Sequence, residues 1–66
     1  MQRLSTQAIG QRKTLHFRTL VELIDFEINL NRTDLEINRQ TRNISGHFTT
    51  LEIDLARDMF AALEVR

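Results

Sequence analysis

The chain has no cysteine and no proline, and its 66 residues include only two glycines, Gly10 and Gly46. Without cysteine it can form no disulfide and no thiolate metal site. The scarcity of proline and glycine, together with 41% hydrophobic residues, argues against disorder and against a turn-rich all-β domain. The composition therefore predicts a folded chain with long helices.

Long hydrophobic runs are also missing, since no stretch approaches the ~18 apolar residues of a membrane span. We therefore expect no membrane partner. No apolar run follows the first residues, Met1 to Leu4, so no secretory signal is indicated. Together with the lack of cysteine, this leads us to expect a cytoplasmic protein.

The small size of the chain predicts association. A chain of about 60 residues buries only roughly 60% of the surface that its unfolded form exposes. Such thin cores are usually supplemented by disulfides, by a metal or by a second chain. Only the second chain suits this composition, so we expect a homodimer.

Charge is distributed unevenly, although the net charge is zero. Residues 1–18 hold four basic residues and no acidic one, which gives +4, whereas residues 19–66 hold five arginines and nine acidic residues, which gives −4. We interpret residues 1–12 as a loose basic arm and residues 13–66 as a single helical domain. The arm is either a solvated tail or a contact for nucleic acid or an acidic partner.

The spacing of apolar residues predicts a first helix over about residues 14–42, either continuous or kinked near Asn31. Thr19 and Glu22 have the spacing of a capping box, in which side chains bond the free amide groups of the first turn. The main alternative is a β-hairpin from Phe26 to Arg39, because this segment also alternates with period two. It lacks a glycine for a tight hairpin turn, which favours the helix.

A turn over residues 43–48 and a second helix over residues 49–65 complete the predicted hairpin. Gly46 offers the left-handed conformation that often ends a helix. Thr49 and Glu52 form the best capping box of the chain, directly before a helical pattern. The expected fold class is therefore all-α: a helical hairpin that dimerises into a four-helix bundle.

The first predicted helix has two apolar faces, which is the most informative feature of the sequence. One face can pack against the second helix, and the other then needs a second molecule. The intrachain core is assigned to Phe17, Leu20, Val21, Ile24, Ile28, Leu51, Leu55 and Met59. The interface with a second copy or another partner is assigned to Leu23, Phe26, Leu30, Ile53, Phe60 and Leu63.

Residue patterns of enzymes are missing from the chain. His16 and His47 are 31 residues apart and lack the spacing of metal ligands. The sequence has no glycine-rich phosphate loop, no Gly-x-Ser-x-Gly elbow and no cysteine nucleophile. We therefore predict no catalytic residue, no metal, no cofactor and no enzymatic activity.

The sequence favours a small regulatory protein, such as an inhibitor, anti-activator or adaptor, that binds another protein as a homodimer. The alternative is a ribbon-helix-helix DNA-binding repressor, in which an N-terminal strand pairs with its twin and lays polar side chains in the major groove. Residues 13–19 alternate as such a strand would, with Leu15 and Phe17 on one face. Contacts to nucleic acid are then assigned to Arg12, Lys13, His16 and Arg18.

Overall fold

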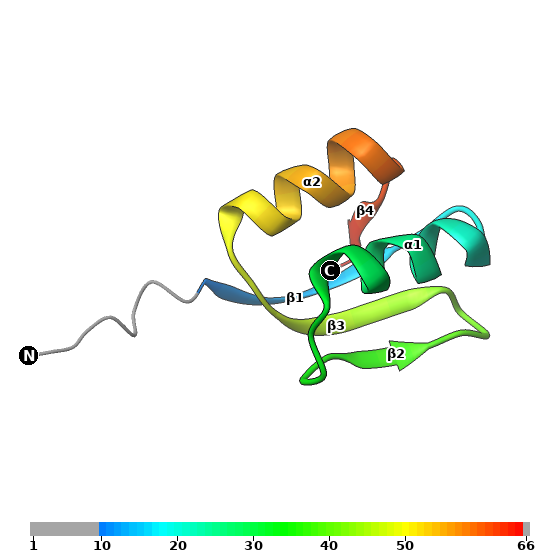
Figure 1. The fold of residues 1–66 in the computed structure, drawn as a ribbon, viewed down its shortest axis with the longest axis horizontal. Coiled ribbons are helices and arrows are strands. Elements are labelled where there is room, and N and C mark those ends of the chain that lie inside the picture. Colours follow the sequence, from blue (N-terminus) through cyan, green and yellow to red (C-terminus); the bar gives the residue numbers. More distant parts are fainter. Residues whose placement is uncertain (1–9, 66) are drawn as a thin grey trace, which may run out of the picture.

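The chain folds into a four-stranded antiparallel sheet and two helices, so the all-α expectation and the four-helix bundle are wrong. The computed structural model describes residues 10–65 (Figure 1). In chain order the elements are β1 (Gln11–His16), α1 (Leu20–Leu30), β2 (Glu36–Asn38), β3 (Asn43–Phe48), α2 (Thr50–Phe60) and β4 (Leu63–Val65).

The strands lie in the order β2-β3-β1-β4, and each neighbouring pair is antiparallel. Both helices lie on the same side of the sheet, and no element of residues 10–65 covers the other side (Figure 1). The β-α-β-β-α-β order with these strand neighbours is the ferredoxin-like, or split β-α-β, topology. This topology hosts many unrelated functions, so it assigns none to the chain.

Strand β1 includes only the first four of residues 13–19, and Leu15 and Phe17 of this segment are both buried. Its partners, however, are β3 on one side and β4 on the other, all within the chain. A ribbon-helix-helix protein pairs its N-terminal strand with a second copy. A strand in the middle of a four-stranded sheet does not match that arrangement.

The two threonines that have the spacing of a capping box do cap the helices, but α1 begins at Leu20 and not at about residue 14 as expected. The Thr19 hydroxyl accepts a hydrogen bond from the Glu22 amide at 3.2 Å, which caps α1. At α2 the capping box is complete, since the Glu52 amide donates to the Thr49 hydroxyl and the Thr49 amide donates to the Glu52 carboxylate. Arg32, from the loop after α1, also donates to this carboxylate at 3.0 Å.

The expected helix over residues 14–42 is wrong at both ends, because only Leu20–Leu30 of this range is helical. Asn31 adopts a left-handed conformation with φ of 51° and ends the helix. Strands β2 and β3 then form a hairpin that starts ten residues later than the alternative from Phe26 to Arg39. Its turn contains no glycine; instead the Asn38 side chain accepts hydrogen bonds from the amides of Gln40 and Thr41.

The expected turn over residues 43–48 is wrong as well, because this segment is strand β3. Gly46 does not take a left-handed conformation: it lies opposite Lys13 in the ladder, facing the helices. A Cβ atom at this position would lie 2.6 Å from Leu35 Cδ2. Glycine is therefore needed here for close packing rather than for a turn.

The second helix is shorter than the expected range of 49–65. Ala61 has a left-handed φ of 55°, and the Ala62 amide donates to the Ala56 carbonyl at 3.0 Å, which closes the last turn. The chain then returns to the sheet as β4, antiparallel to β1. Among residues 10–65, no helix is long and apolar enough to cross a bilayer.

All four phenylalanines of the chain meet between the sheet and the helices. The Phe26 ring lies 5.2 Å from that of Phe17, 5.6 Å from that of Phe60 and 6.3 Å from that of Phe48. Leu15, Leu23, Ile44 and Ala56 are buried in the same cluster. The core therefore joins α1 to β1, β3 and α2.

The two apolar faces of α1 exist, but the structure reverses their roles. Of the expected intrachain core, Phe17 is buried and Ile24 and Leu55 are partly buried, whereas the remaining five residues are exposed: Leu20, Val21, Ile28, Leu51 and Met59. Of the expected interface, only Leu63 is exposed. Leu23 and Phe26 are fully buried, and Leu30, Ile53 and Phe60 pack against the core.

The reversal can be tested with one substitution on each face of α1. Phe26→Ala should lower the free energy of unfolding by about 3–5 kcal/mol, because it empties the centre of the core. Ile28→Ala should change the unfolding free energy of the monomer, measured at a dilution where the chain does not associate, by less than about 0.5 kcal/mol, because the side chain is exposed in the single chain. Urea denaturation of both variants measures the difference, and equal losses would contradict the assignment of faces.

The capping box of α2 gives a second prediction. Thr49→Ala removes the hydroxyl that accepts the Glu52 amide, and it should lower the free energy of unfolding by about 0.5–2 kcal/mol. Thr50→Ala, an exposed neighbour within the helix, is the matched control and should cost less. Chemical denaturation reports both values.

Candidate functional site

No group of three or more histidine, cysteine, aspartate or glutamate side chains within residues 10–65 is placed to hold a metal ion. His16 and His47 lie on the open side of the sheet, on neighbouring strands. The features that could serve a function are three surfaces: the outer side of the helices, the open side of the sheet, and a groove beside β1.

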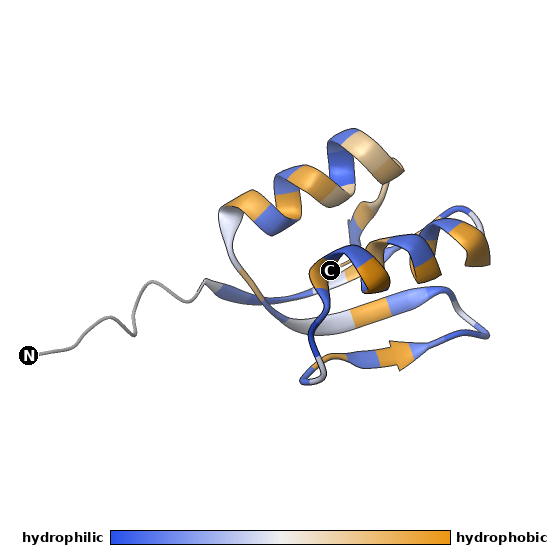
Figure 2. Cartoon of the chain, viewed as in Figure 1, coloured by the Kyte–Doolittle hydropathy of each residue, from blue (hydrophilic) through white to orange (hydrophobic). Residues whose placement is uncertain are grey.

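The first surface is the outer side of the two helices, here called the helix-layer surface. Its exposed apolar residues are Leu20, Val21 and Ile28 on α1, and Leu51 and Met59 on α2. Val21 and Ile28 retain 67% and 68% of their accessible area, and Leu51 and Met59 retain 81% and 71%. Figure 2 shows hydrophobic positions along both helices, and no other element of the described part of the chain covers this layer.

The helical period explains why α1 is apolar on two sides. Leu23, Phe26 and Leu30 follow at intervals of three and four residues and face the sheet. Val21 and Ile28 are two turns apart on the opposite side. A helix packed on one sheet needs only the first group, so the second group is not explained by the fold of this chain.

Acidic side chains accompany the apolar residues of this surface. The two helices contain six acidic residues and one basic residue, Arg57. Asp25 is exposed and lies within one turn of both Val21 and Ile28. The helix-layer surface is therefore apolar with a negative charge.

Two carboxylates near the helix ends are held in the ionised form. A hydrogen bond from Arg18, 2.6 Å long, lowers the pKa of Glu22 below its usual value. In the same way Arg32 lowers the pKa of Asp34. A lowered pKa stabilises the folded chain only where the carboxylate is ionised. The stabilisation from Glu22 and from Asp34 is therefore present at neutral pH, and it is lost as the pH falls through the folded-state pKa of each carboxylate.

The second surface, the open side of the sheet, is mostly polar and internally hydrogen-bonded, although Leu63 and Val65 of β4 are exposed apolar residues on the same side. The Thr14 and Ser45 hydroxyls lie 2.7 Å apart, and His16 Nδ1 lies 2.8 Å from Asn43 Oδ1. Arg12 reaches across β3 to the carboxylate of Glu36 at 2.8 Å. These side chains satisfy one another across the strands.

The residues expected to contact nucleic acid do not form one basic patch. Arg12 and His16 lie on the open side of the sheet, whereas Lys13 lies on the helix side and pairs with Glu64 at 3.1 Å. Arg18 follows the strand and pairs with Glu22. With its three cationic side chains in ion pairs and pointing to different sides, this set offers little to a phosphate backbone.

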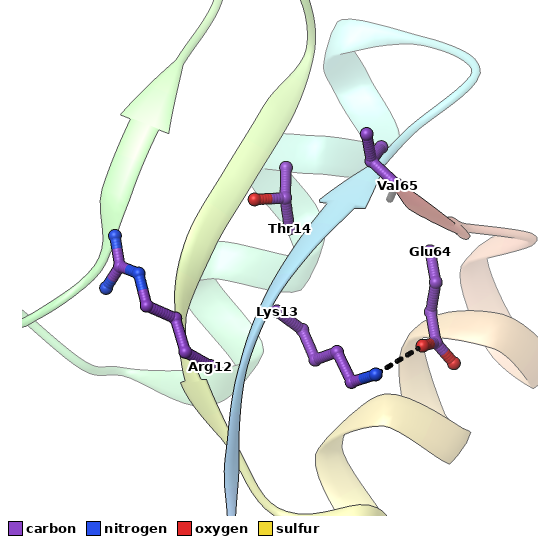
Figure 3. Close-up of a pocket in the computed structure, with 5 residues that line it drawn as sticks. All are labelled: Arg12, Lys13, Thr14, Glu64 and Val65. Carbon is purple, nitrogen blue, oxygen red and sulfur yellow. Dashed lines mark ion pairs between the residues drawn. The ribbon is translucent and has the colours of Figure 1, made fainter.

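The third surface is a groove of about 600 Å³ beside β1 (Figure 3). It is lined by Arg12, Lys13 and Thr14 of β1 and by Glu64 and Val65 of β4. Figure 3 shows the ion pair between Lys13 and Glu64 spanning the space between the two strands. This groove could not be predicted from the sequence, because no pattern in the sequence indicates β4.

The apolar members of the helix-layer surface can be recognised in the sequence, but their role cannot. Its five residues were placed in the core, since periodicity shows that α1 has two apolar faces without showing which one is covered. One signal was available: Phe26 is the largest side chain on either face of α1, and large aromatic residues dominate small cores.

Comparison with known proteins adds no assignment. No protein-family model, no curated protein and no solved structure matches the chain. The surfaces of the chain itself therefore carry the functional proposal.

Proposed function

We propose that this chain is a small, non-enzymatic regulatory protein that acts by binding protein through its helix-layer surface. A second copy of the chain is the first occupant proposed, so that the free protein is a homodimer. The observation that carries the proposal is the exposure of Val21 and Ile28 on the side of α1 that faces away from the sheet.

The hydrophobic effect supplies the driving force for this binding. Fully burying one side chain of this size is worth about 1.5–3 kcal/mol. Four such residues, Val21, Ile28, Leu51 and Met59, each leave most of their surface in water. Val21 and Ile28, two turns apart on one side of α1, form an exposed apolar stripe of the kind found in binding sites.

Charge should modulate the binding of two copies. Two helix layers that face each other bring like charges together, among them Asp25 of each copy. Exposed charge pairs contribute at most about 1 kcal/mol and are screened by salt. Self-association should therefore become stronger, not weaker, as the salt concentration rises.

Sedimentation equilibrium at micromolar concentration tests the homodimer. The wild-type chain should be a dimer, and the double variant Val21→Ser with Ile28→Ser should be a folded monomer, because both side chains are exposed and outside the core. Leu63→Ser is the matched control: it removes an exposed leucine outside the helix layer and should leave the dimer intact.

A monomer at every concentration and salt would reject the second copy as occupant. The broader proposal would then depend on capture from a cell extract of the source organism. A partner retained by wild type and by Leu63→Ser, but lost by the double variant, would support it. Equal capture by all three proteins, or capture by none, would overturn it.

A further inference from the structure

Asp25 is the one acidic residue whose side chain has no cationic partner within residues 10–65. The other eight acidic residues of the chain each form an ion pair, at distances from 2.6 to 3.9 Å: Glu22, Glu27, Asp34, Glu36, Glu52, Asp54, Asp58 and Glu64. Exposed pairs of this kind contribute little to stability. They do set Asp25 apart, because its charge alone is left without compensation in the described part of the chain.

Helix α1 itself cannot neutralise this charge. A side chain on a helix meets those three and four positions away, which for Asp25 are Val21, Glu22, Ile28 and Asn29. None of them is basic. The Asn29 side-chain amide donates to the backbone carbonyl of Asp25 at 2.9 Å and not to the carboxylate. The Asp25 side chain is therefore exposed with its charge available to a partner.

The uncompensated carboxylate lies within the exposed apolar stripe of α1. At about 100° per residue, Val21, Asp25 and Ile28 fall within about 60° of one another around the helix axis. All three side chains are exposed. The stripe is therefore apolar at both ends and negatively charged at its centre.

The spacing of this stripe suits a helical partner. Val21, Asp25 and Ile28 follow at intervals of four and three residues, which is the spacing of positions that meet a second helix packed lengthwise. A helix that lies along α1 presents its own side chains at the same intervals. A strand alternates with period two and does not match them.

We infer that the helix-layer surface binds an amphipathic helix of another protein, with a lysine or arginine opposite Asp25 and apolar residues opposite Val21 and Ile28. This inference rests on the proposed function, because it names the partner of the same surface. The target helix replaces a second copy of the chain on α1, since both need Val21 and Ile28.

The chemistry of Asp25 explains why the partner is basic and has long side chains. The aspartate side chain is short, so its carboxylate stays close to α1, between two apolar side chains. Lysine and arginine have aliphatic stems that can cover Val21 or Ile28 while the charged group reaches the carboxylate. Where α1 meets α1 of a second copy, the two Asp25 carboxylates repel instead. Charge therefore favours the basic helix over the second copy.

Matched peptides test the charge of the partner. The probe is a capped, fluorescently labelled peptide of about 18 residues, long enough to form a helix. Its central turns carry leucine, lysine and leucine at intervals of four and three residues, with alanine and glutamine elsewhere, and a second peptide has glutamate in place of the lysine. By fluorescence anisotropy, the wild-type chain should bind the lysine peptide at least about tenfold more tightly, because one pair attracts and the other repels. No binding of the lysine peptide, or equal binding of the two, would overturn the inference.

A charge reversal in the protein tests the position of the contact. Asp25→Lys should reverse the preference, so that the glutamate peptide binds at least about tenfold more tightly than the lysine peptide. The side chain is exposed and outside the core, so the fold is retained. Glu36→Lys, on the open side of the sheet, changes the net charge equally and should keep the wild-type preference. An unchanged preference in Asp25→Lys, or a reversal in Glu36→Lys, would contradict the proposed pairing.

Salt separates this binding from self-association. The Debye length falls from about 10 Å at 0.1 M salt to about 3 Å at 1 M, so the ion pair with Asp25 is screened. The lysine peptide should therefore bind more weakly at the higher concentration, whereas self-association of the chain should become stronger. Tighter binding of the lysine peptide at high salt would show that the ion pair does not form.

The double variant Val21→Ser with Ile28→Ser distinguishes failure of this inference from failure of the proposed function. It should bind neither peptide, because the apolar ends of the stripe are lost. If wild type binds both peptides equally and the double variant binds neither, the inference fails and the proposed function stands. If the double variant binds the lysine peptide as tightly as wild type does, the stripe is not the binding surface, and the proposed function fails as well.

Discussion

The contact of Phe26 with the three other phenylalanines is the interaction on which the rest of the structure depends. Each ring comes from a different place: Phe17 follows β1, Phe48 ends β3 and Phe60 ends α2. With so short a chain, these rings and a few aliphatic side chains make up nearly all of the buried core in residues 10–65. The position of α1 over the sheet follows from where Phe26 must lie.

That constraint also determines what α1 presents to solvent. Once Leu23 and Phe26 face the sheet, Val21 and Ile28 must face away from it, because they lie on the opposite side of the same helix. The open side of the sheet, by contrast, carries polar groups that bond one another. The two outer sides of the protein thus differ in chemistry: the open side of the sheet is mostly polar, with Leu63 and Val65 at its β4 edge, whereas the outer side of the helices has apolar residues on both helices with no cover within the described chain.

The parts of the fold that local chemistry determines could be predicted from the sequence. The hydroxyls of Thr19 and Thr49 cap the helices as expected, and the alternation around Leu15 and Phe17 is that of a strand. The β2–β3 hairpin could not be predicted, because Asn38 and the left-handed Arg42 replace the usual glycine of its turn. Strand β4 could not be predicted either. In the sequence, Leu63–Val65 continues the apolar pattern of α2, whereas in the structure the helix ends at Ala61, before this segment.

The role of each apolar face could not be read from periodicity, because an exposed face and a buried one have the same period. The groove beside β1 depends on the register of two strands that are 47 residues or more apart in sequence, which no local pattern encodes. Surfaces that arise from long-range pairing are therefore the part of this protein that only the structure could reveal.

Arg32 shows how closely the two halves of the chain are joined. Its guanidinium bonds both Asp34 and Glu52 and lies 5.7 Å from the centre of the Phe48 ring. Glu52 also caps α2, so the start of the second helix is completed by a residue twenty positions earlier. An isolated peptide of residues 49–62 would retain the local box without this support. Helix α2 therefore has the full set of contacts at its first turn only when the loop after α1 is in place, which couples the stability of the second β-α-β half to that of the first.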